Sequence, residues 1–372
     1  MDLEESIVEK NDKATLPIDK NLQPEVPRYD QWEWYSPLTS PFLITGLPWL
    51  AQDGLYRRLP LRPSHPIRSE VDRLANFPTG VQVRFKTDST KLAVRIILAD
   101  KATMYQMPAT VQCGVDCYIG PMGKQKYVNT TRFELTQTEY ESVLFEAFSQ
   151  EMREVTLNLP LYQGVKELWI GIAPEAAVTA FDGFASNKKV LLYGTSITHG
   201  ACASRPGMAY PNQLSRAFPL EFVSLGFSGN AQGEPELAHL ISQISDPALL
   251  VLDYEGNTPS TEHLAESLPT FIRIYRNVHP QVPILVISQI RFAREAFDEE
   301  LRLRREARKE LQRGIVECLR QEGDAHLHFC DGAELLGEDY QECTADGIHP
   351  SDLGYKHMAD RLRPVLAKLL QY

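Results

Sequence analysis

The stretch of residues 189–207 reads KVLLYGTSITHGACASRPG. Its apolar run KVLLY has the length of a buried strand, and the Gly, Thr and Ser that follow are typical of the turn after a strand. Four further apolar runs come later, EFVSL, ALLVLD, PILVISQI and HLHFC, and helical stretches separate them. Strands that alternate with helices predict a parallel sheet that is covered on both faces.

The chain has a different pattern before about residue 187. Short apolar stretches (VQVRFKT, KLAVRIIL, ATVQCGVDCYIG, EVTLNLPL and ELWIGIA) lie between turn-rich pieces such as GPMGK and LYQG. This pattern predicts an antiparallel β-sandwich with a jelly-roll-like form. A chain of 372 residues is too long for one ordinary core. We therefore predict a loose arm over residues 1–28, the β-sandwich domain over 29–186 and an α/β domain over 187–372.

The composition disfavours several classes of function. Lys and Arg number 38 against 49 Asp and Glu, and the net charge of -11 disfavours nucleic acid and anionic membranes as partners. No apolar run reaches the ~18 residues of a membrane span, and the charged first residues lack the apolar core of a secretory signal.

The six irregularly spaced Cys indicate buried thiols of a reducing compartment, and hence a cytoplasmic protein. Cys113 and Cys117 lack the second pair of a zinc site, so we predict no metal. The sequence does not determine the oligomeric state, and it is compatible with a homo-oligomer.

Ser196 follows the first strand of the predicted parallel sheet, at the edge where such sheets bind ligands. The Gly-x4-Gly-Lys spacing of a phosphate loop is absent here, and Thr198 stands where a Gly-x-Ser-x-Gly elbow needs glycine. Two interpretations stay open on this stretch alone. One is a nucleophilic serine on another α/β scaffold, and the other is an ordinary strand-to-helix turn.

The segment TADGIHPSDLG, residues 344–354, supplies the partners that a nucleophilic serine needs. Asp346 and His349 are three residues apart, and Pro350 biases His349 toward an extended or turn conformation. Ser351 is placed to cap the last helix. A local Asp can orient the imidazole while His takes the serine proton, so Ser196, Asp346 and His349 are the candidate catalytic residues.

A serine nucleophile also needs hydrogen-bond donors for the oxyanion that forms during attack. The stretch GFSGNAQG follows the second strand, and its Gly229 can present a backbone N–H. The stretch YEGNTPS follows the third strand, and its Asn257 can present a side-chain amide. With the backbone N–H of Ser196 they form the candidate oxyanion hole. Thr195 and Arg205 are weaker candidates for substrate binding, and a structural salt bridge is the alternative role of Arg205.

These blocks resemble those of the SGNH hydrolases, also called GDSL-type esterases. In that family the first block carries the Ser, the second the Gly, the third the Asn and the last an Asp-x-x-His, and here they read GTSIT, GFSGNA, YEGN and DGIH. The chain departs from Gly-Asp-Ser at Thr195 and from Gly-x-Asn-Asp at Thr258. The stretches GTSITHGACASRPGMAYP and DGIHPSDLGYKHMAD, with GVDCY at 114–118, resemble the branch that has an N-terminal Gly-x-Asp-Leu-Tyr domain.

The resemblance implies a three-layer α/β/α hydrolase domain after the β-sandwich, and an esterase that uses no cofactor. Ser196 would attack the acyl carbonyl, His349 would move the proton with Asp346 orienting it, and the oxyanion hole would hold the negative charge. Relatives of this two-part build often remove acetyl groups from sugars, so the resemblance implies an O-acetylesterase acting on a small acetylated carbohydrate. The alternatives are a carbohydrate-binding protein with an inert hydrolase half, and a lipase or thioesterase acting on other acyl esters.

Three other features have ordinary roles in our interpretation. Asp331 follows the last predicted strand and is read as a helix cap rather than a rival triad acid. Trp32, Trp34 and Trp49 are read as packing residues, with contact to sugar rings as the alternative. Residues 294–322 form a charged helix with one solvated face.

Overall fold

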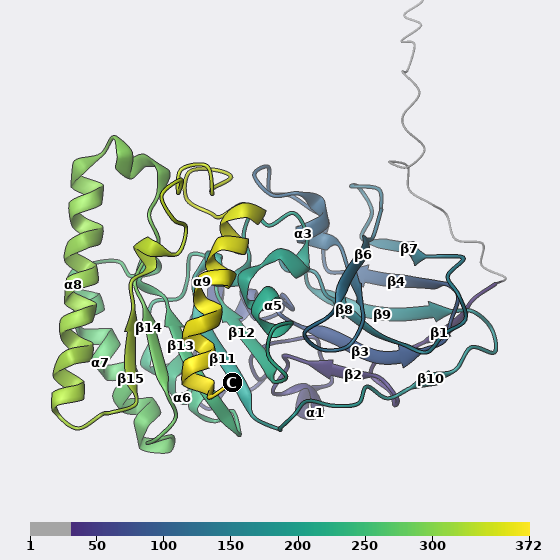
Figure 1. Cartoon of the computed structure of the whole chain (residues 1–372), viewed down its shortest axis with the longest axis horizontal. Helices are drawn as coiled ribbons and strands as arrows, with labels where there is room; N and C mark the ends of the chain where they lie inside the picture. The colour runs from purple at the N-terminus through teal and green to yellow at the C-terminus, as the bar shows by residue number, and fades with distance from the viewer. Residues whose placement is uncertain (1–30) are drawn as a thin grey trace, which may run out of the picture.

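The computed structural model describes residues 31–372 (Figure 1), so the predicted arm over residues 1–28 lies outside the described part. Two antiparallel sheets lie between residues 33 and 179, and a parallel sheet with helices on both faces lies between residues 189 and 370. The predicted fold class is confirmed: an antiparallel β region precedes an α/β/α domain. The boundary at residues 186–187 and the jelly-roll connectivity stay predictions.

The first antiparallel sheet has four strands in the order β1-β9-β4-β7. These strands are β1 (Glu33–Tyr35), β9 (Val165–Ile172), β4 (Leu92–Leu98) and β7 (Glu139–Phe145). Val94, Ile96 and Leu98 of β4 are buried at every second position, as expected for a strand with one face on a core.

The second antiparallel sheet has the strand order β10-β3-β8-β5-β6, and β2 also pairs with β3. Its strands are β10 (Val178–Thr179), β3 (Gln82–Thr87), β8 (Arg153–Asn158), β5 (Asp116–Ile119), β6 (Lys126–Thr130) and β2 (Leu43–Thr45). Val83 and Phe85 of this sheet share one apolar core with Val94 and Ile96 of the first sheet. Three short helices also belong to this part of the chain: α1 (Leu50–Asp53), α2 (Ser69–Leu74) and α3 (Ala109–Cys113).

The parallel sheet has five strands in the order β12-β11-β13-β14-β15. They are β12 (Glu221–Gly226), β11 (Lys189–Gly194), β13 (Pro247–Asp253), β14 (Ile284–Ile287) and β15 (Leu327–Cys330). The accompanying helices are α4 (Ser196–His199), α5 (Tyr210–Ser215), α6 (Pro235–Ser242), α7 (Thr261–Val278), α8 (Glu299–Gln321) and α9 (Asp352–Leu370). Single turns of 3-10 helix are η3 (Pro206–Met208), η4 (Glu255–Asn257), η5 (Ala293–Ala296) and η6 (Gly332–Glu334).

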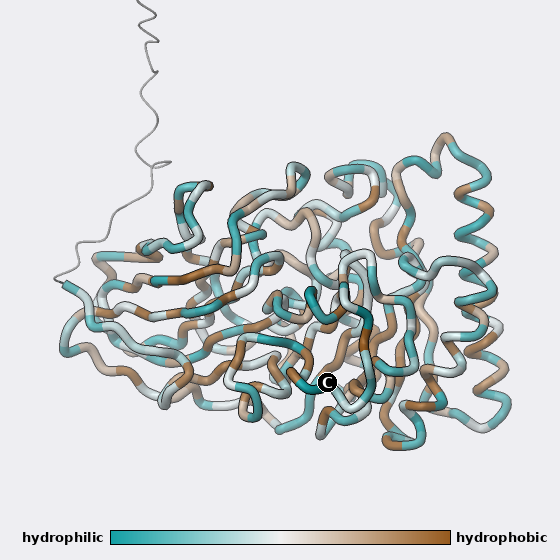
Figure 2. Tube along the Cα trace, turned by 180° about the vertical axis from the view of Figure 1, so that it is seen from behind, coloured by the Kyte–Doolittle hydropathy of each residue, from teal (hydrophilic) through white to brown (hydrophobic). Residues whose placement is uncertain are grey.

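Side chains of β11 are buried on both faces of the parallel sheet, which explains its uninterrupted apolar run. Leu191 and Tyr193 belong to the apolar cluster that includes residues of α6, α7 and α8. Val190 and Leu192 belong to the cluster that includes residues of α4, α5 and α9. In Figure 2 the apolar colour runs along strands inside the molecule, and the outer helix α8 carries much hydrophilic colour.

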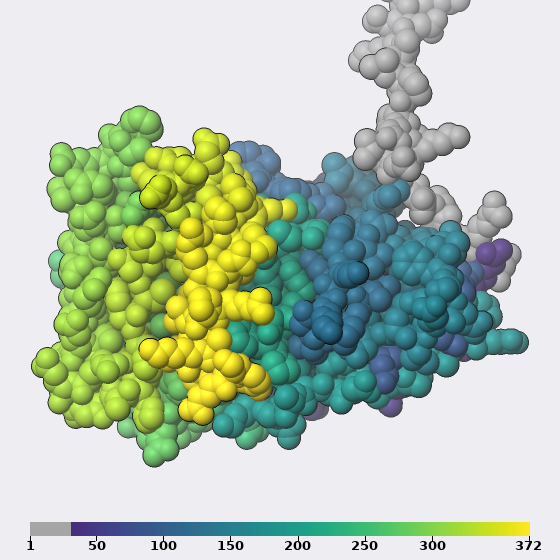
Figure 3. All heavy atoms as spheres, in the orientation of Figure 1, coloured from purple at the N-terminus to yellow at the C-terminus, as the bar shows by residue number. Residues whose placement is uncertain are grey.

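Arg58 connects the N-terminal part of the chain to the parallel sheet. Its side chain is fully buried, and its guanidinium donates hydrogen bonds to the carbonyl oxygens of Ser224 at 3.1 Å and Gly226 at 2.8 Å, both in β12. It also donates to the carbonyl oxygen of Phe77 at 2.6 Å. Burial lowers the pKa of Arg58 to about 9. The two parts of the molecule pack directly against each other, as the space-filling view shows (Figure 3).

The tryptophans have packing contacts, as the sequence predicted. The ring of Trp34 lies under the guanidinium of Arg95 at 4.6 Å and against the backbone of Gly171. The ring of Trp32 lies under Lys91 at 4.5 Å, and Trp49 packs against the apolar cluster of α6 and α7. Among residues 31–372, no helix is both long enough and apolar enough to cross a membrane.

Candidate active site

Ser196 is the first residue of α4 and lies directly after β11. The strand ends at Gly194, where an added Cβ would lie 2.1 Å from Oγ1 of Thr198 and 2.6 Å from the carbonyl oxygen of Asp253. Only glycine fits there, because both atoms leave no room for a side chain. Thr195 then caps the helix, since its Oγ1 accepts a hydrogen bond from the backbone N–H two residues further on at 3.2 Å. This sharp turn places Ser196 at the carboxyl end of the sheet.

The three candidate catalytic residues form one hydrogen-bonded chain. Oγ of Ser196 lies 2.8 Å from Nε2 of His349, and Nδ1 of His349 lies 2.7 Å from Oδ2 of Asp346. The Asp346 carboxylate only accepts hydrogen bonds, so Nδ1 carries the ring proton. Nε2 is therefore left to accept the hydrogen bond from the Ser196 hydroxyl. Ser196 and His349 are 153 residues apart in the sequence, and the fold brings them into contact.

The loop before α9 fixes the orientation of His349. Oδ1 of Asp346 accepts hydrogen bonds from the backbone N–H groups of Ile348 at 3.0 Å and of His349 at 2.8 Å. Burial raises the pKa of Asp346, but the hydrogen bonds and the charge of His349 lower it more, so its net pKa lies below the ordinary value. Asp346 is therefore ionised at neutral pH. Ser351 occupies the N-cap position as predicted, but its hydroxyl donates to the carbonyl oxygen of Cys343 instead of capping the helix.

The three predicted oxyanion donors face one cleft. Ser196, Gly229 and Asn257 all line it, and Gly229 adopts a left-handed backbone conformation with φ of 69°. Oδ1 of Asn257 accepts a hydrogen bond from the backbone N–H of Ala231 at 3.4 Å. That contact sets the orientation of the amide and leaves Nδ2 without a protein partner among the described residues. The N–H groups of Ser196 and Gly229 also donate to no other group there.

The cleft has a volume of about 390 Å³ and combines polar and apolar walls. Its apolar lining comes from Ile197, Ile290, Phe292 and Ile348. Thr195 lines it as well, so its position is compatible with the predicted contact to substrate.

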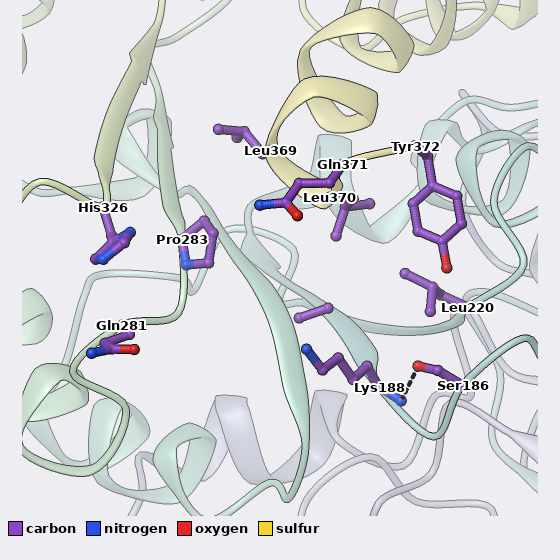
Figure 4. A pocket seen from close by; sticks show the side chains of 11 residues that line it. Ser186, Lys188, Leu220, Gln281, Pro283, His326, Leu369, Leu370, Gln371 and Tyr372 are labelled. Carbon is purple, nitrogen blue, oxygen red and sulfur yellow. Dashed lines mark hydrogen bonds between the residues drawn. The ribbon is translucent and has the colours of Figure 1, made fainter.

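A larger cavity of about 500 Å³ lies at the amino ends of the parallel strands (Figure 4). Lys188, His326 and the last residues of α9 line it, and Oγ of Ser186 there accepts a hydrogen bond from the backbone N–H of Lys188 at 3.0 Å. Open α/β sheets bind ligands at the carboxyl ends of their strands. The larger cavity also lacks a serine bonded to a histidine, so we assign the candidate active site to the smaller cleft.

Arg205 does not line the cleft, so the prediction that it binds substrate is corrected. Its guanidinium donates to Oδ2 of Asp116 at 2.9 Å and to the hydroxyl of Tyr118 at 2.6 Å, and it lies 3.7 Å from the ring centre of Tyr127. Asp116 is fully buried and needs a cationic partner. Asp116 and Tyr118 are the third and fifth residues of GVDCY, so this motif holds the loop that follows the nucleophile. The salt-bridge alternative is the one that the geometry matches.

Two polar residues of the cleft were not assigned from the sequence. Asp253 is the last residue of β13, and Gln289 comes two residues after β14 ends. Each lies at or near the carboxyl end of a predicted apolar run, Asp253 in ALLVLD and Gln289 in PILVISQI. A polar residue at that end of an apolar run is the sequence signal that could have identified them. Asp331 has its predicted role, because its side chain accepts a hydrogen bond from the backbone N–H of Ala333 at 3.0 Å and caps η6.

Cys202 lies beside the candidate triad. Its Sγ is 3.9 Å from Oδ2 of Asp346, and burial, together with that carboxylate, raises the pKa of the thiol to about 12. Within residues 31–372, Cys202, Asp346 and His349 are the one group of three side chains with metal-binding atoms within 4.8 Å of one another. Both ring nitrogens of His349 are already engaged, by Asp346 and by Ser196. We therefore assign no metal to this group.

Comparisons with known proteins agree with this architecture. Residues 187–367 match the GDSL-like lipase/acylhydrolase family, and residues 32–178 match the Gly-x-Asp-Leu-Tyr N-terminal domain of SGNH-hydrolase-type esterases. The chain therefore belongs to the SGNH hydrolases, in the branch that carries this N-terminal domain. A search of curated protein sequences found no significant match.

Three solved structures illustrate the similarity. A GDSL-like lipase from Bacteroides ovatus is 29% identical, with a TM-score of 0.83 over 91% of this chain and 98% of that chain. The salicylyl-acyltransferase SsfX3 from a tetracycline biosynthetic pathway is 21% identical, with a TM-score of 0.71 over 91% and 97%. A family two carbohydrate esterase from Cellvibrio japonicus is 13% identical, with a TM-score of 0.60 over 91% and 98%. At these identities the last two show only that the fold is shared.

Proposed function

We propose that the protein is a serine esterase that hydrolyses short-chain acyl esters, and that its substrate is an O-acetylated carbohydrate. The hydrogen-bonded chain from Ser196 through His349 to Asp346 carries this proposal, because it supplies a nucleophile, a base and the group that orients the base. A carbohydrate-binding protein with an inert hydrolase half has no need of such a chain.

The proposed reaction has two stages. In the first, Oγ of Ser196 attacks the acyl carbon while its proton passes to Nε2 of His349. The N–H groups of Ser196 and Gly229 and the amide of Asn257 hold the oxyanion, and the leaving alcohol then takes the proton from Nε2. In the second stage, water attacks the acyl-serine, with His349 again as base, and releases the acid. Asp346 stays ionised throughout and stabilises the imidazolium.

Two observations support an acetylated sugar as the substrate class. The cleft offers polar groups beside apolar side chains, which suits a ring with hydroxyls on its edge and carbon on its faces. The carbohydrate esterase described above also shares the two-part build over 91% of this chain. The predicted cytoplasmic location, and the absence of nucleic-acid and membrane partners, stay predictions.

A labelling experiment and an acetate-release screen test this proposal together. We expect a fluorophosphonate probe to label the folded protein at Ser196, identified by peptide mass spectrometry. We also expect acetate release from acetylated oligosaccharides, and faster turnover of acetyl than of octanoyl esters of one alcohol. Absence of labelling would favour the carbohydrate-binding alternative. Faster turnover of octanoyl esters would favour a lipase.

Asn257→Ala is expected to lower kcat about 100- to 1000-fold, with KM little changed. The reason is that a preorganised donor binds the developing oxyanion better than the ground-state ester. Steady-state kinetics on an aryl acetate measure both constants. Asn129→Ala is a suitable control, since Asn129 lies in β6 of the antiparallel sheet. A rise in KM with kcat preserved would make Asn257 a turn residue rather than an oxyanion donor.

A further inference from the structure

Asp253 is a carboxyl group in the active-site cleft that the proposed mechanism does not use. It ends β13, beside the strand that carries the nucleophile, and its carbonyl oxygen accepts the backbone N–H of Thr195 at 3.2 Å. The residue is only 9% exposed, and it lines the cleft together with Ser196 and Asn257. Burial of a carboxyl group costs free energy, so a buried carboxyl group in the cleft needs a structural or functional explanation.

One oxygen of Asp253 is already occupied. Oδ2 accepts hydrogen bonds from Oγ1 of Thr198 at 2.9 Å and from the hydroxyl of Tyr210 at 3.0 Å. These two hydroxyls are fully buried and hold the carboxyl group in one orientation. Oδ1 has no hydrogen-bond partner among the described residues. Since Asp253 lines the cleft, we infer that Oδ1 is left as an acceptor for a bound molecule.

Gln289 supplies a second unpaired polar group in the same cleft. Its backbone N–H donates to Oε2 of the buried Glu255 at 2.7 Å, which fixes the main chain at this point. Its side-chain amide has no partner among the described residues. Gly256 lies between Gln289 and Thr195: a Cβ there would be 3.7 Å from Oε1 of Gln289 and 3.8 Å from Cγ2 of Thr195. The absence of a side chain at Gly256 keeps this part of the cleft open.

We propose that Asp253 and Gln289 form a polar subsite that binds a hydroxyl group of the substrate next to the scissile ester bond. The carboxylate accepts a hydrogen bond from the hydroxyl, and the amide can donate to or accept from the same or a neighbouring hydroxyl. The apolar side chains of the cleft, such as Phe292, contact the carbon skeleton. This inference rests on the proposed esterase activity and deepens it, because it names the residues that distinguish a hydroxylated ester from a plain one.

The protonation state of Asp253 sets the conditions of the test. Burial raises the pKa of Asp253 to about 7, and the nearby Glu255 adds to the increase, while the hydroxyls of Thr198 and Tyr210 lower it. The carboxyl group is therefore a mixture of both forms at neutral pH. The measurements are therefore made at pH 8.5, where Asp253 of the wild-type enzyme is predominantly ionised.

The experiment compares matched pairs of esters that differ in hydroxyl groups. The first pair, 2,3-dihydroxypropyl acetate and propyl acetate, places the hydroxyls on the alcohol part. The second pair, ethyl glycolate and ethyl acetate, places one on the acyl part. The readout is the ratio of kcat/KM for the hydroxylated ester to kcat/KM for the plain ester, in wild type and variants. A loss of activity common to both esters cancels in this ratio.

Asp253→Asn is expected to lower the ratio of the first pair about 10- to 100-fold, because a charged acceptor is replaced by a neutral amide. Gln289→Leu is expected to lower it about 2- to 10-fold, and it provides a second reading if the Asp253 variant folds poorly. Asp331→Asn is the matched control. Asp331 is another carboxylate that follows a strand, but it caps η6 and does not line the cleft, so this variant should retain the wild-type ratio.

Each result has a definite meaning. A fall confined to the ethyl glycolate pair supports the subsite, assigns the hydroxyl to the acyl part and argues against acetylated sugars. An unchanged ratio in both pairs for Asp253→Asn and Gln289→Leu overturns the subsite while the esterase activity stands. A ratio that falls as much in Asp331→Asn also overturns it, because the fall would then not depend on a residue of the cleft. If no ester is hydrolysed and Ser196 is not labelled, the proposed function and the subsite both fall.

Discussion

Ser196→Ala is expected to lower kcat by about 10⁴- to 10⁶-fold on any ester that the wild type hydrolyses, because among the described cleft residues the Ser196 hydroxyl is the one that is hydrogen-bonded to a histidine. The substitution removes one oxygen atom, and the packing of Ile197 and Thr198 behind it is unchanged. The thermal midpoint should therefore stay close to that of the wild type. Steady-state kinetics with an aryl acetate and thermal unfolding followed by circular dichroism measure the two effects.

Ser351→Ala is a matched control for this result. Ser351 lies two residues from His349, but its hydroxyl donates to the carbonyl oxygen of Cys343, away from Ser196. We expect its kcat to stay within about threefold of the wild type, as for surface changes away from the chemistry. A Ser196→Ala enzyme that kept kcat within about tenfold would contradict covalent catalysis at this residue.

Asp346→Asn is expected to lower kcat about 10³- to 10⁴-fold. Asn can present an N–H to Nδ1 of His349, which moves the ring proton to Nε2 and leaves no lone pair to accept the Ser196 proton. The hydrogen bonds from the N–H groups of Ile348 and His349 to Oδ1 can be kept by the Asn oxygen, so the loop itself should fold. The measurement is kcat on an aryl acetate at pH 8, with circular dichroism as the check of folding.

Asp331→Asn supplies the control for Asp346→Asn. Asp331 is the other acid that follows a strand near the end of the chain, and it caps η6 and pairs with Lys309 at 3.2 Å. Its substitution should leave kcat within about threefold. A large loss in Asp331→Asn together with normal activity in Asp346→Asn would reverse the assignment of the triad acid.

The sequence predicted the fold class and the candidate triad because each depends on local pattern. The apolar runs around Val190 and Leu250 have the period and length of strands buried on both faces, and the DGIH block places Asp346 and His349 in one turn. These signals lie within a few residues of the chain. The geometry of Ser196 and His349 then follows from the topology, since both lie at the carboxyl edge of one sheet.

The roles of Arg205 and Asp253 depend on contacts between distant segments, so local pattern was not enough. Arg205 forms a salt bridge with Asp116, which lies in the antiparallel part of the chain. Asp253 lines the cleft, and Thr198 and Tyr210, from other segments, donate hydrogen bonds to its Oδ2. Ser351 has the right position for a cap, but a competing acceptor, the carbonyl of Cys343, takes its hydroxyl.

The buried guanidinium of Arg58 has a consequence for how the polypeptide can be divided. Its donors satisfy the carbonyl groups of Ser224 and Gly226, just before Gly229, while the arginine itself comes from the antiparallel half. Separating the chain into two pieces at residue 187 would expose those carbonyl groups, and the apolar surface around them, to water. We therefore expect the two halves to unfold together, and we expect a chimera that exchanges the N-terminal half to need the segment around Arg58 together with the hydrolase half.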